Sequence, residues 1–215
     1  MNYVITSNNS VTFGPSPWNS FQFQSILNSD FGITNSLPAT DPGTPVILTD
    51  TVSVVPVASI TYPSFNNITQ QLAGPNWTVA GNSAVATYTV VDKPIQAVRS
   101  NLKDMAAINR YRAEVAGTTA VVNGANVTVT TDRVGKQVYF QQLATATDTP
   151  INFKIGTTWV QANVQDFGNI TTAITNYVQS TFNWEANLAQ YIDSLSTLTA
   201  LANVVTTFGA NVSTQ

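Results

Sequence analysis

The sequence predicts an α+β protein: a small β-rich N-terminal part with one short helix, and a C-terminal part with two long helices and β-hairpins. Eight of the ten prolines lie before residue 92, which favours short strands and turns over long helices in that part. After residue 92, apolar residues recur three and four positions apart over two long stretches, as in helices with one buried face. We therefore expect two domains, at residues 1–91 and 92–215.

The N-terminal domain is expected to begin with a strand and a helix. Residues 3–5 form a short β-prone run. The Gly-Pro-Ser-Pro-Trp sequence of residues 14–18 predicts a turn and then a helix, with Pro17 at its first position and its end before Gly32. The buried face of this helix is expected to be rich in aromatic residues, along the rows Trp18, Phe21, Ser25, Asn28 and Phe21, Gln24, Leu27.

Three further runs of this domain are predicted to be strands, at residues 46–48, 52–60 and 84–91. Pro56 interrupts the second run, and because proline donates no backbone hydrogen bond, it predicts an edge strand or a bulge. Residues 74–77 (Gly-Pro-Asn-Trp) and 81–83 (Gly-Asn-Ser) are typical of turns.

The C-terminal domain is expected to begin with a helix that extends to residue 115. Asp92 and Pro94 are typical of a helix start, with an acid near the positive helix end, and Gly117 is a natural stop. The residues that recur at helical spacing are Ile95, Val98, Leu102, Met105, Ala106 and Asn109, and the opposite face carries Arg99, Lys103 and Arg110.

The rest of the chain predicts two hairpins and three helices. Asn123-Gly124 favours a two-residue turn within residues 121–127, and Gly156-Thr157 predicts a second turn within residues 153–160. A helix capped by Asp132 is expected at residues 133–144, with Val134, Val138 and Gln141 following its cap. Asn163 is expected to cap the longest helix, which extends to residue 194. A short helix at residues 195–201 follows, and the tail after Gly209 is expected to fray.

Composition excludes several kinds of chemistry. Cysteine and histidine are absent, so the chain has no disulfide, no thiolate or imidazole metal ligand, and no Ser-His or Cys-His nucleophile pair. The eight Lys and Arg residues form no run and the net charge is −3, so we expect no nucleic-acid binding. No window reaches about 18 apolar residues, so we expect no membrane span. The start of the sequence does not resemble a signal peptide.

Low charge is the most unusual property of the composition. Charged residues make up 9% of the chain, against roughly 25% in ordinary domains, whereas hydrophobic residues make up 43%. Thr, Asn, Ser and Gln supply the polar surface instead. We interpret this as a surface that packs into an assembly. The alternative is a β-rich protein with a neutral surface.

Four tryptophans are candidates for a sugar-stacking platform: Trp18, Trp77, Trp159 and Trp184. Each lies in an apolar periodic context, so we expect core packing instead. The glutamates, Glu114 and Glu185, lie on predicted helices and are expected at the surface or supporting a hairpin, not as the paired carboxylates of a glycosidase.

Other polar residues are expected to be structural. The aspartates show no metal-binding spacing, although distant loops could still converge: Asp30, Asp41, Asp50, Asp92, Asp104, Asp132, Asp148, Asp166 and Asp193. Asp132 and Arg133 could anchor a partner, but we favour a helix cap and a local ion pair. We therefore predict no catalytic, cofactor-binding or metal residues, no enzyme and no cofactor.

Several sequence blocks resemble proteins of tailed bacteriophages. NRYRAEVAG (109–117), VNGANVTVTTDR (122–133), FKIGTTWV (153–160) and YVQSTFNWEANLAQYID (177–193) resemble a domain of tail-fibre-assembly-like proteins and tail appendages. GPSPWNSFQF (14–23), Pro-Val-Ile (45–47), VSVVPVASI (52–60) and GPNWTVAGNSAVATYTVVDKPIQAV (74–98) resemble the N-terminal region of cyanophage virion structural proteins. The resemblance covers about residues 1–205. Where members of the family have Lys and Glu, this chain has Thr, Ser and Gln.

This resemblance implies a non-enzymatic structural protein of the virion, most simply a tail appendage or baseplate component that links tail fibre to baseplate. Residues 1–91 would be the attachment domain and residues 92–215 the tail-fibre-assembly-like domain. Partners would be other tail, baseplate and fibre proteins and further copies of the chain, without nucleic acid or membrane. The location would be the virion tail, and the host cytoplasm during assembly. A tail-fibre assembly chaperone and a receptor-binding fibre tip remain alternatives.

Overall fold

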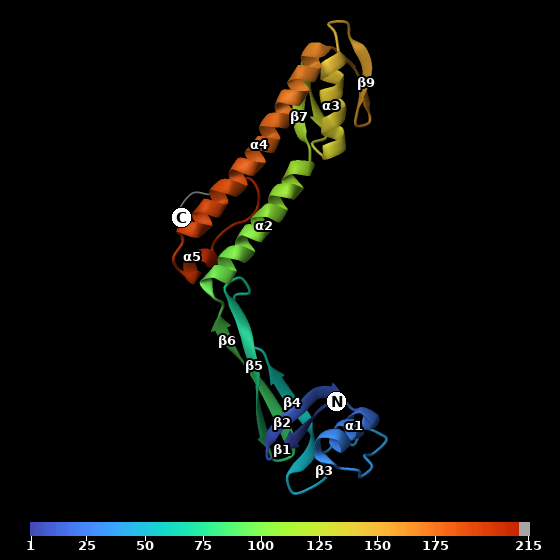
Figure 1. Cartoon of the computed structure of the whole chain (residues 1–215), viewed down its shortest axis with the longest axis vertical. Coiled ribbons are helices and arrows are strands. Elements are labelled where there is room, and N and C mark those ends of the chain that lie inside the picture. The colour runs from blue at the N-terminus through green and yellow to red at the C-terminus, as the bar shows by residue number, and fades with distance from the viewer. Residues whose placement is uncertain (211–215) are drawn as a thin grey trace. The chain divides into compact units, whose positions relative to one another are not determined.

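A computed structural model describes residues 1–210 of the chain, and Figure 1 shows its elements. The α+β class is confirmed: a β-rich first part with a short helix precedes a second part with long helices and hairpins. The chain divides into two compact units, Met1–Asp92 and Lys93–Gln215, one residue from the boundary that the sequence predicts. We describe each unit by itself.

The first unit is built on one six-stranded sheet, with the order β2-β1-β4-β6-β5 and β3 beside β4. Its described pairs are antiparallel except β4 with β6, which run parallel. The strands are β1 (Asn2–Ser7), β2 (Ser10–Pro17), β3 (Val46–Ile47), β4 (Val52–Thr61), β5 (Gln70–Ala80) and β6 (Ser83–Asp92). The strands predicted at residues 3–5, 46–48, 52–60 and 84–91 are therefore confirmed, as is the turn at 81–83.

Two Gly-Pro pairs that predicted turns lie inside strands. Gly14-Pro15 falls in β2, where the pairing jumps from Tyr3↔Ser16 to Ile5↔Phe13. Residues 74–75 fall in β5 at a similar jump, between Ala73 and Asn76. Both strands are edge strands, which tolerate proline, and in each a bulge accommodates the Gly-Pro pair. The predictions of a turn at residues 14–18 and at 74–77 are therefore wrong.

Pro56 lies in β4, which is an internal strand in the sheet order. Pairing of β4 with β1 ends at Pro56, and pairing with β6 begins at Val57, with an irregularity before Ser59. The proline thus occupies the point where the strand changes partners. Of the two predicted alternatives, an edge strand or a bulge, the structure has the bulge, which lies next to Pro56.

The helix of this unit, α1 (Ser20–Phe31), begins later than predicted, and its buried face matches the prediction only in part. Asn19 caps it by accepting the N–H of Gln22, so Pro17 is not a helical residue. Leu27 is fully buried, as predicted, together with Phe23, whereas Phe21, which the prediction also placed on the buried face, is 84% exposed. Trp18 lies before the helix and stacks on the Phe23 ring. The predicted stop is confirmed, because Gly32 follows the helix in a left-handed conformation.

In the second unit, every predicted helix and hairpin is present within residues 93–210. Figure 1 shows α2 beside the C-terminal half of α4, with opposite chain directions. The elements are α2 (Ile95–Val115), β7 (Thr118–Val122), β8 (Ala125–Val129), α3 (Arg133–Thr145), β9 (Ile151–Ile155), β10 (Thr158–Ala162), α4 (Val164–Ser194) and α5 (Leu198–Ala202). Pro94 is the N-cap of α2, which confirms the predicted helix start; Asp92 ends β6 two residues before this cap, and the first turn of the helix contains no acid.

The buried face of α2 consists of Val98, Leu102 and Ala106. Met105, which the spacing predicts on that face, is 38% exposed. The basic residues expected on the opposite face instead bind the C-terminal half of α4 and the residue after it. Arg99 donates to the Leu195 carbonyl at 2.6 Å, Lys103 pairs with Asp193 at 2.7 Å, and Arg110 pairs with Glu185 at 2.8 Å.

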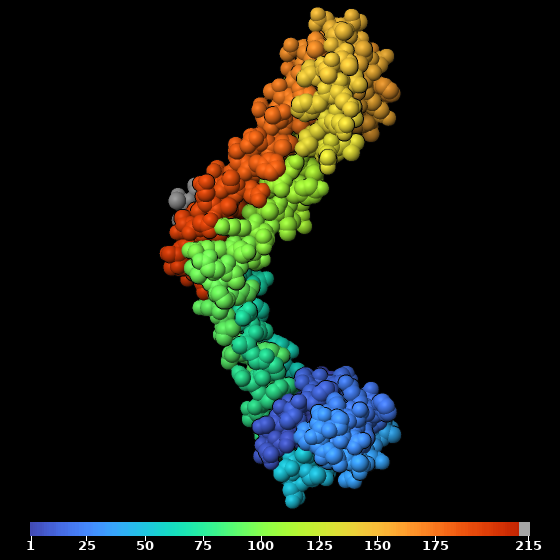
Figure 2. Space-filling model, viewed as in Figure 1, coloured from blue at the N-terminus to red at the C-terminus, as the bar shows by residue number. Residues whose placement is uncertain are grey.

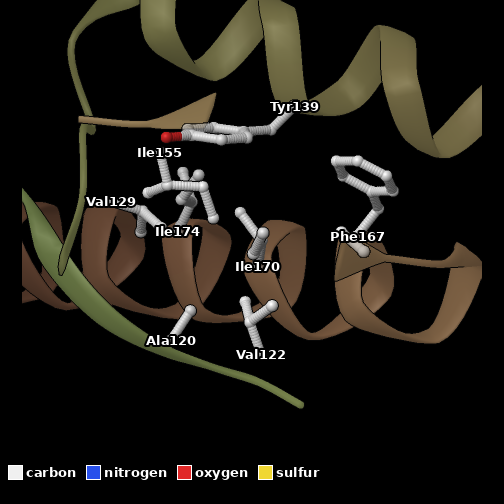
Figure 3. Packing of buried hydrophobic residues seen from close by; sticks show 9 residues of the cluster. Ala120, Val122, Val129, Tyr139, Ile155, Phe167, Ile170 and Ile174 are labelled. Carbon is white, nitrogen blue, oxygen red and sulfur yellow. The ribbon is translucent and has the colours of Figure 1, made fainter. Parts of the chain in front are cut away.

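A second core lies where the two hairpins and α3 cover the first half of α4. Figure 3 shows Tyr139 above Ile155, Ile170 and Ile174, with Val129 beside them. The cluster consists of Ala120, Val122, Val129, Tyr139, Ile155, Ala162, Phe167, Ile170 and Ile174. One apolar layer therefore holds both hairpins to α4.

The predicted local signals of this region are confirmed. Asn123 and Gly124 adopt positive φ angles of 51° and 77° in the β7–β8 turn. Asn163 and Asp166 form a capping box at the start of α4. The predicted fraying after Gly209 concerns mostly residues 211–215, which lie outside the described residues. Within residues 1–210, no helix is both long and apolar enough to cross a bilayer.

Candidate functional site

A shallow groove of about 570 Å³ lies between the two hairpins of the second unit. Its walls are the β7–β8 hairpin, from Val122 to Thr128, and the β9–β10 hairpin, from Ile155 to Val160. The two hairpins form separate two-stranded sheets, so no strand ladder joins them. No titratable side chain lines the groove, so its walls offer contact by shape and by hydrogen bonds of the backbone, the threonine hydroxyls and the asparagine amides.

Trp159 lies on the outer face of β10 and is 67% exposed. The ammonium of Lys154, its register partner in β9, lies 5.9 Å from the Trp159 ring centre. Asn152 of β9 and Gln161 of β10 lie on the same face, where they are register partners and the Gln161 side chain donates a hydrogen bond to that of Asn152. The prediction of core packing is therefore wrong for Trp159, because the alternate residues Val160 and Ala162 face the core.

The other three tryptophans are buried or half-buried, unlike Trp159. Trp184 is 8% exposed, which confirms its predicted burial. Trp77 is half-buried beside Val4, Val55 and Ala84. Trp18 is half-buried too, and its indole N–H donates to the Pro38 carbonyl at 3.2 Å. A platform of several exposed tryptophans is therefore not present.

The two glutamates belong to a half-buried ion-pair network. Arg110 binds both Glu114 and Glu185, and Lys136 of α3 reaches Glu114 at 3.1 Å. The Arg110 guanidinium also lies 4.5 Å from the Phe182 ring centre. The network joins α2, α3 and α4, so these carboxylates are held by cations and do not face a substrate cleft.

Asp132 caps α3, as predicted, by accepting the N–H groups of Val134 and Gly135. Arg133 is exposed and belongs to none of the ion pairs between described residues, so the predicted local pair is not seen. No group of three or more acidic side chains able to hold a metal ion occurs within residues 1–210.

One carboxylate of the first unit has a perturbed pKa. The buried Tyr3 hydroxyl donates to Asp41, and the Gly43 N–H donates to the same carboxylate. Burial, and secondarily Asp41, raises the pKa of Tyr3 to about 12. The Tyr3 hydrogen bond, followed by the Gly43 N–H, lowers the pKa of Asp41 below its usual 3.8. The pair fastens the loop after α1 to β1.

The most extensive feature that the sequence analysis missed is an apolar stripe on the outer face of α2. It consists of Met105, Ile108, Tyr111 and Val115, and we call it the α2 stripe. These side chains are 38, 52, 59 and 37% exposed. In the space-filling view, α2 is open at the surface beside α4 (Figure 2). The spacing of the stripe was visible in the sequence, but α2 is apolar on two faces, and spacing alone does not say which is buried.

The chain was compared with known proteins: no protein-family model, no curated protein and no solved structure matches it.

Proposed function

We propose that the chain is a non-enzymatic structural protein of a tailed bacteriophage virion, a tail appendage or baseplate component that links tail fibre to baseplate. The observation that carries the proposal is the exposure of large apolar side chains, the α2 stripe and Trp159 among them, on a surface in which charged residues are scarce. Interfaces between proteins are enriched in aromatic residues and Met and depleted in Lys, Glu and Asp. The order of the resembling sequence blocks adds the virion context.

In this proposal the two units have different tasks. Residues 1–91 attach the protein to one neighbour, and residues 92–215 contact the fibre and further copies of the chain. The second unit supports this assignment with three contact surfaces: the α2 stripe, the groove between the hairpins and the face around Trp159. Because none of them gathers acid, base and nucleophile, binding explains them more simply than catalysis.

The receptor-binding tip remains a second candidate because of Trp159. An exposed indole with Lys154, Asn152 and Gln161 beside it offers a stacking surface and hydrogen-bonding groups to a sugar ring. Glycan recognition predicts that Trp159→Ala abolishes adsorption of phage to cells while Trp159→Phe retains part of it. Equal adsorption by the wild type and Trp159→Ala would exclude the tip.

The structural role is tested by immunogold electron microscopy of purified virions with an antibody to this chain. Label at the tail tip is the expected result. Label at the neck or capsid would contradict the baseplate location but would still identify the protein as a structural component of the virion. Absence from virions, with the protein present in lysates of infected cells, would overturn the structural role in favour of the assembly chaperone. Virions from a phage that lacks the gene are the matched negative control.

A further inference from the structure

The α2 stripe lies on the side of α2 that faces away from α4. Val98, Leu102 and Ala106 form the buried side of the helix. At 3.6 residues per turn, the stripe residues occupy about a third of the helix circumference, which begins beside the buried side at Met105 and reaches the opposite side at Tyr111. The long helix thus has an apolar face whose side chains remain 37–59% exposed in the described chain.

Two charged residues lie on the same face, at equal distances from the centre of the stripe. Asp104 precedes Ile108 by four residues, and Arg112 follows it by four. Four residues are slightly more than one turn, so both lie close to the row of Ile108. Along the helix, the face therefore has an acidic residue before Ile108 and a basic residue after it, at equal spacing. Met105 and Tyr111 are also placed symmetrically, three residues before and after Ile108.

Neither residue is paired with an opposite charge inside the described chain. Asp104 and Arg112 are exposed, and no ion pair between described residues includes them. Arg112 has one long hydrogen bond, of 3.5 Å, to the Asn109 side chain. By contrast, the basic residues on the side toward α4 are all engaged.

We propose that the α2 stripe binds the α2 stripe of a second copy of this chain, antiparallel and about a two-fold axis at Ile108. In this arrangement Ile108 meets Ile108 of the partner subunit, and Met105 meets the partner's Tyr111. Asp104 meets the partner's Arg112, and the two-fold axis makes this pair occur twice. The central part of the face, from Asp104 to Arg112, is therefore complementary to itself in polarity and charge, whereas Val115 meets the partner's Asn101 at the end of the contact.

The charges also select the orientation. In a parallel pair, each residue meets its own counterpart, so the Asp104 carboxylates would lie together and the Arg112 guanidinium groups likewise. Like charges across an interface oppose association. The antiparallel pair replaces both repulsions with attractions.

The size of the stripe limits the strength of the contact. Four partly exposed side chains on one helix cover less than the roughly 800 Å² per partner of a standard interface. A short stripe suits two helices that cross at an angle and touch mainly at the centre. We therefore expect a weak dimer that forms as concentration rises, as is useful where many copies gather in a virion. In that respect the inference rests on the proposed function.

The test is sedimentation equilibrium of the full chain over about a hundredfold range of concentration, which brackets weak dimerisation. The wild type is expected to shift from monomer to dimer. Asp104→Arg alone and Arg112→Asp alone should each weaken dimerisation about tenfold, because each places two pairs of like charges together. The double variant Asp104→Arg/Arg112→Asp should restore it, because the charges are exchanged. Arg133→Asp, on the exposed surface of α3, is the matched control and should change nothing.

Disulfide trapping tests the orientation of the two helices. Because the chain has no cysteine of its own, only the introduced cysteine can form a disulfide. Ile108→Cys should form an intermolecular disulfide readily, since the two copies of this position meet at the axis. Asn101→Cys should not, because seven residues on either side of the axis separate its copies by about 21 Å, far beyond disulfide reach. Faster trapping at position 101 than at 108 would overturn the antiparallel arrangement.

Failure of this inference is distinguishable from failure of the proposed function. A wild type that stays monomeric throughout, or a double variant that does not regain dimerisation, overturns the two-fold dimer whatever the virion labelling shows. Ile108→Asp should abolish the dimer with an unchanged circular dichroism spectrum, since Ile108 is exposed and its substitution leaves the core intact.

Discussion

Arg110 of α2 and Glu185 of α4 lie 75 residues apart in the sequence, and the Arg110 Nε donates to the Glu185 Oε2 at 2.8 Å. The same guanidinium binds Glu114, one turn further along α2, and Glu114 also pairs with Lys136 of α3. Three helices are thus joined around one arginine. Its side chain is 18% exposed, so water screens these interactions only partly.

Replacement of Arg110 is expected to destabilise the second unit. Arg110→Met keeps the apolar stem but leaves Glu185 without a cation and Glu114 with Lys136 alone. The expected loss in the free energy of unfolding is about 1–3 kcal/mol, between the values for exposed and buried pairs. Urea denaturation followed by circular dichroism measures it.

The matched control for Arg110→Met is Lys103→Met, on the same helix. The Lys103–Asp193 pair also joins α2 to α4, but its side chains are 37 and 57% exposed. Its loss should cost below about 1 kcal/mol. Equal losses in the two variants would contradict a special role for the Arg110 network.

The hydroxyl of Thr131 is expected to stabilise the connection between α2 and the β7–β8 hairpin. Thr131 is fully buried, donates to the Glu114 carbonyl, and accepts the Gly117 N–H at 2.9 Å. Thr131→Val keeps the shape but leaves both backbone groups unpaired, which should lower the free energy of unfolding by about 1–3 kcal/mol.

Thr131→Ser is the companion variant, because it keeps the hydroxyl and loses one methyl group. Its expected cost is about 0.8 kcal/mol. If thermal melts ranked Thr131→Ser below Thr131→Val, packing and not hydrogen bonding would dominate at this position.

Two helical glycines should respond to alanine with opposite signs. At Gly135 in α3, an added Cβ would lie 1.9 Å from the Thr130 Oγ1 and 2.9 Å from its Cβ, so Gly135→Ala should destabilise by about 1–3 kcal/mol. At Gly168 in α4, nothing lies within 4 Å of an added Cβ, so Gly168→Ala should stabilise by about 0.5–1 kcal/mol.

The melting temperatures of the two alanine variants provide the comparison. Adding Thr130→Ala to Gly135→Ala should recover part of the loss, because the contact with the hydroxyl disappears. A Gly135→Ala variant as stable as the wild type would show that Thr130 moves away at little cost.

Local signals in the sequence were enough to predict the hairpins and helix starts of the second unit. Asn123-Gly124, the Asp132 cap and the Asn163 cap each act within a few residues, so their meaning does not depend on distant neighbours. The predicted hairpins and helices follow from them.

Features that depend on distant neighbours could not be predicted in this way. The Gly-Pro pairs at 14–15 and 74–75 lie in strands because β2 and β5 are sheet edges, which only the assembled sheet defines. Met105 faces outward because α4 covers the other face of α2, and a helix that is apolar on two sides does not reveal that choice. The α2 stripe was missed for the same reason.

The first unit should lose stability in alkali through Tyr3. Because its pKa in the folded state is about 12, above the ordinary 10.0, the unfolded chain releases this proton first as the pH rises. The contribution of Tyr3 is therefore complete below about pH 10 and declines as the pH rises through the folded value near 12. Asp41 acts in the opposite direction: its contribution is present above its usual pKa and is lost as the pH falls through the lowered value.

Tyr3→Phe separates this effect from general alkaline damage. Trp18 lies with its ring centre 5.0 Å from that of Tyr3, so its fluorescence, in a variant with the other three tryptophans replaced by Phe, reports unfolding of the first unit. We expect the stability of the Tyr3-containing protein to fall between about pH 10 and 12 and that of Tyr3→Phe to stay nearly level. The Asp41→Asn variant should still lose most of the same stability in alkali, since burial is the larger cause of the raised pKa of Tyr3. A decline of equal size in Tyr3→Phe would assign the alkaline sensitivity to other groups.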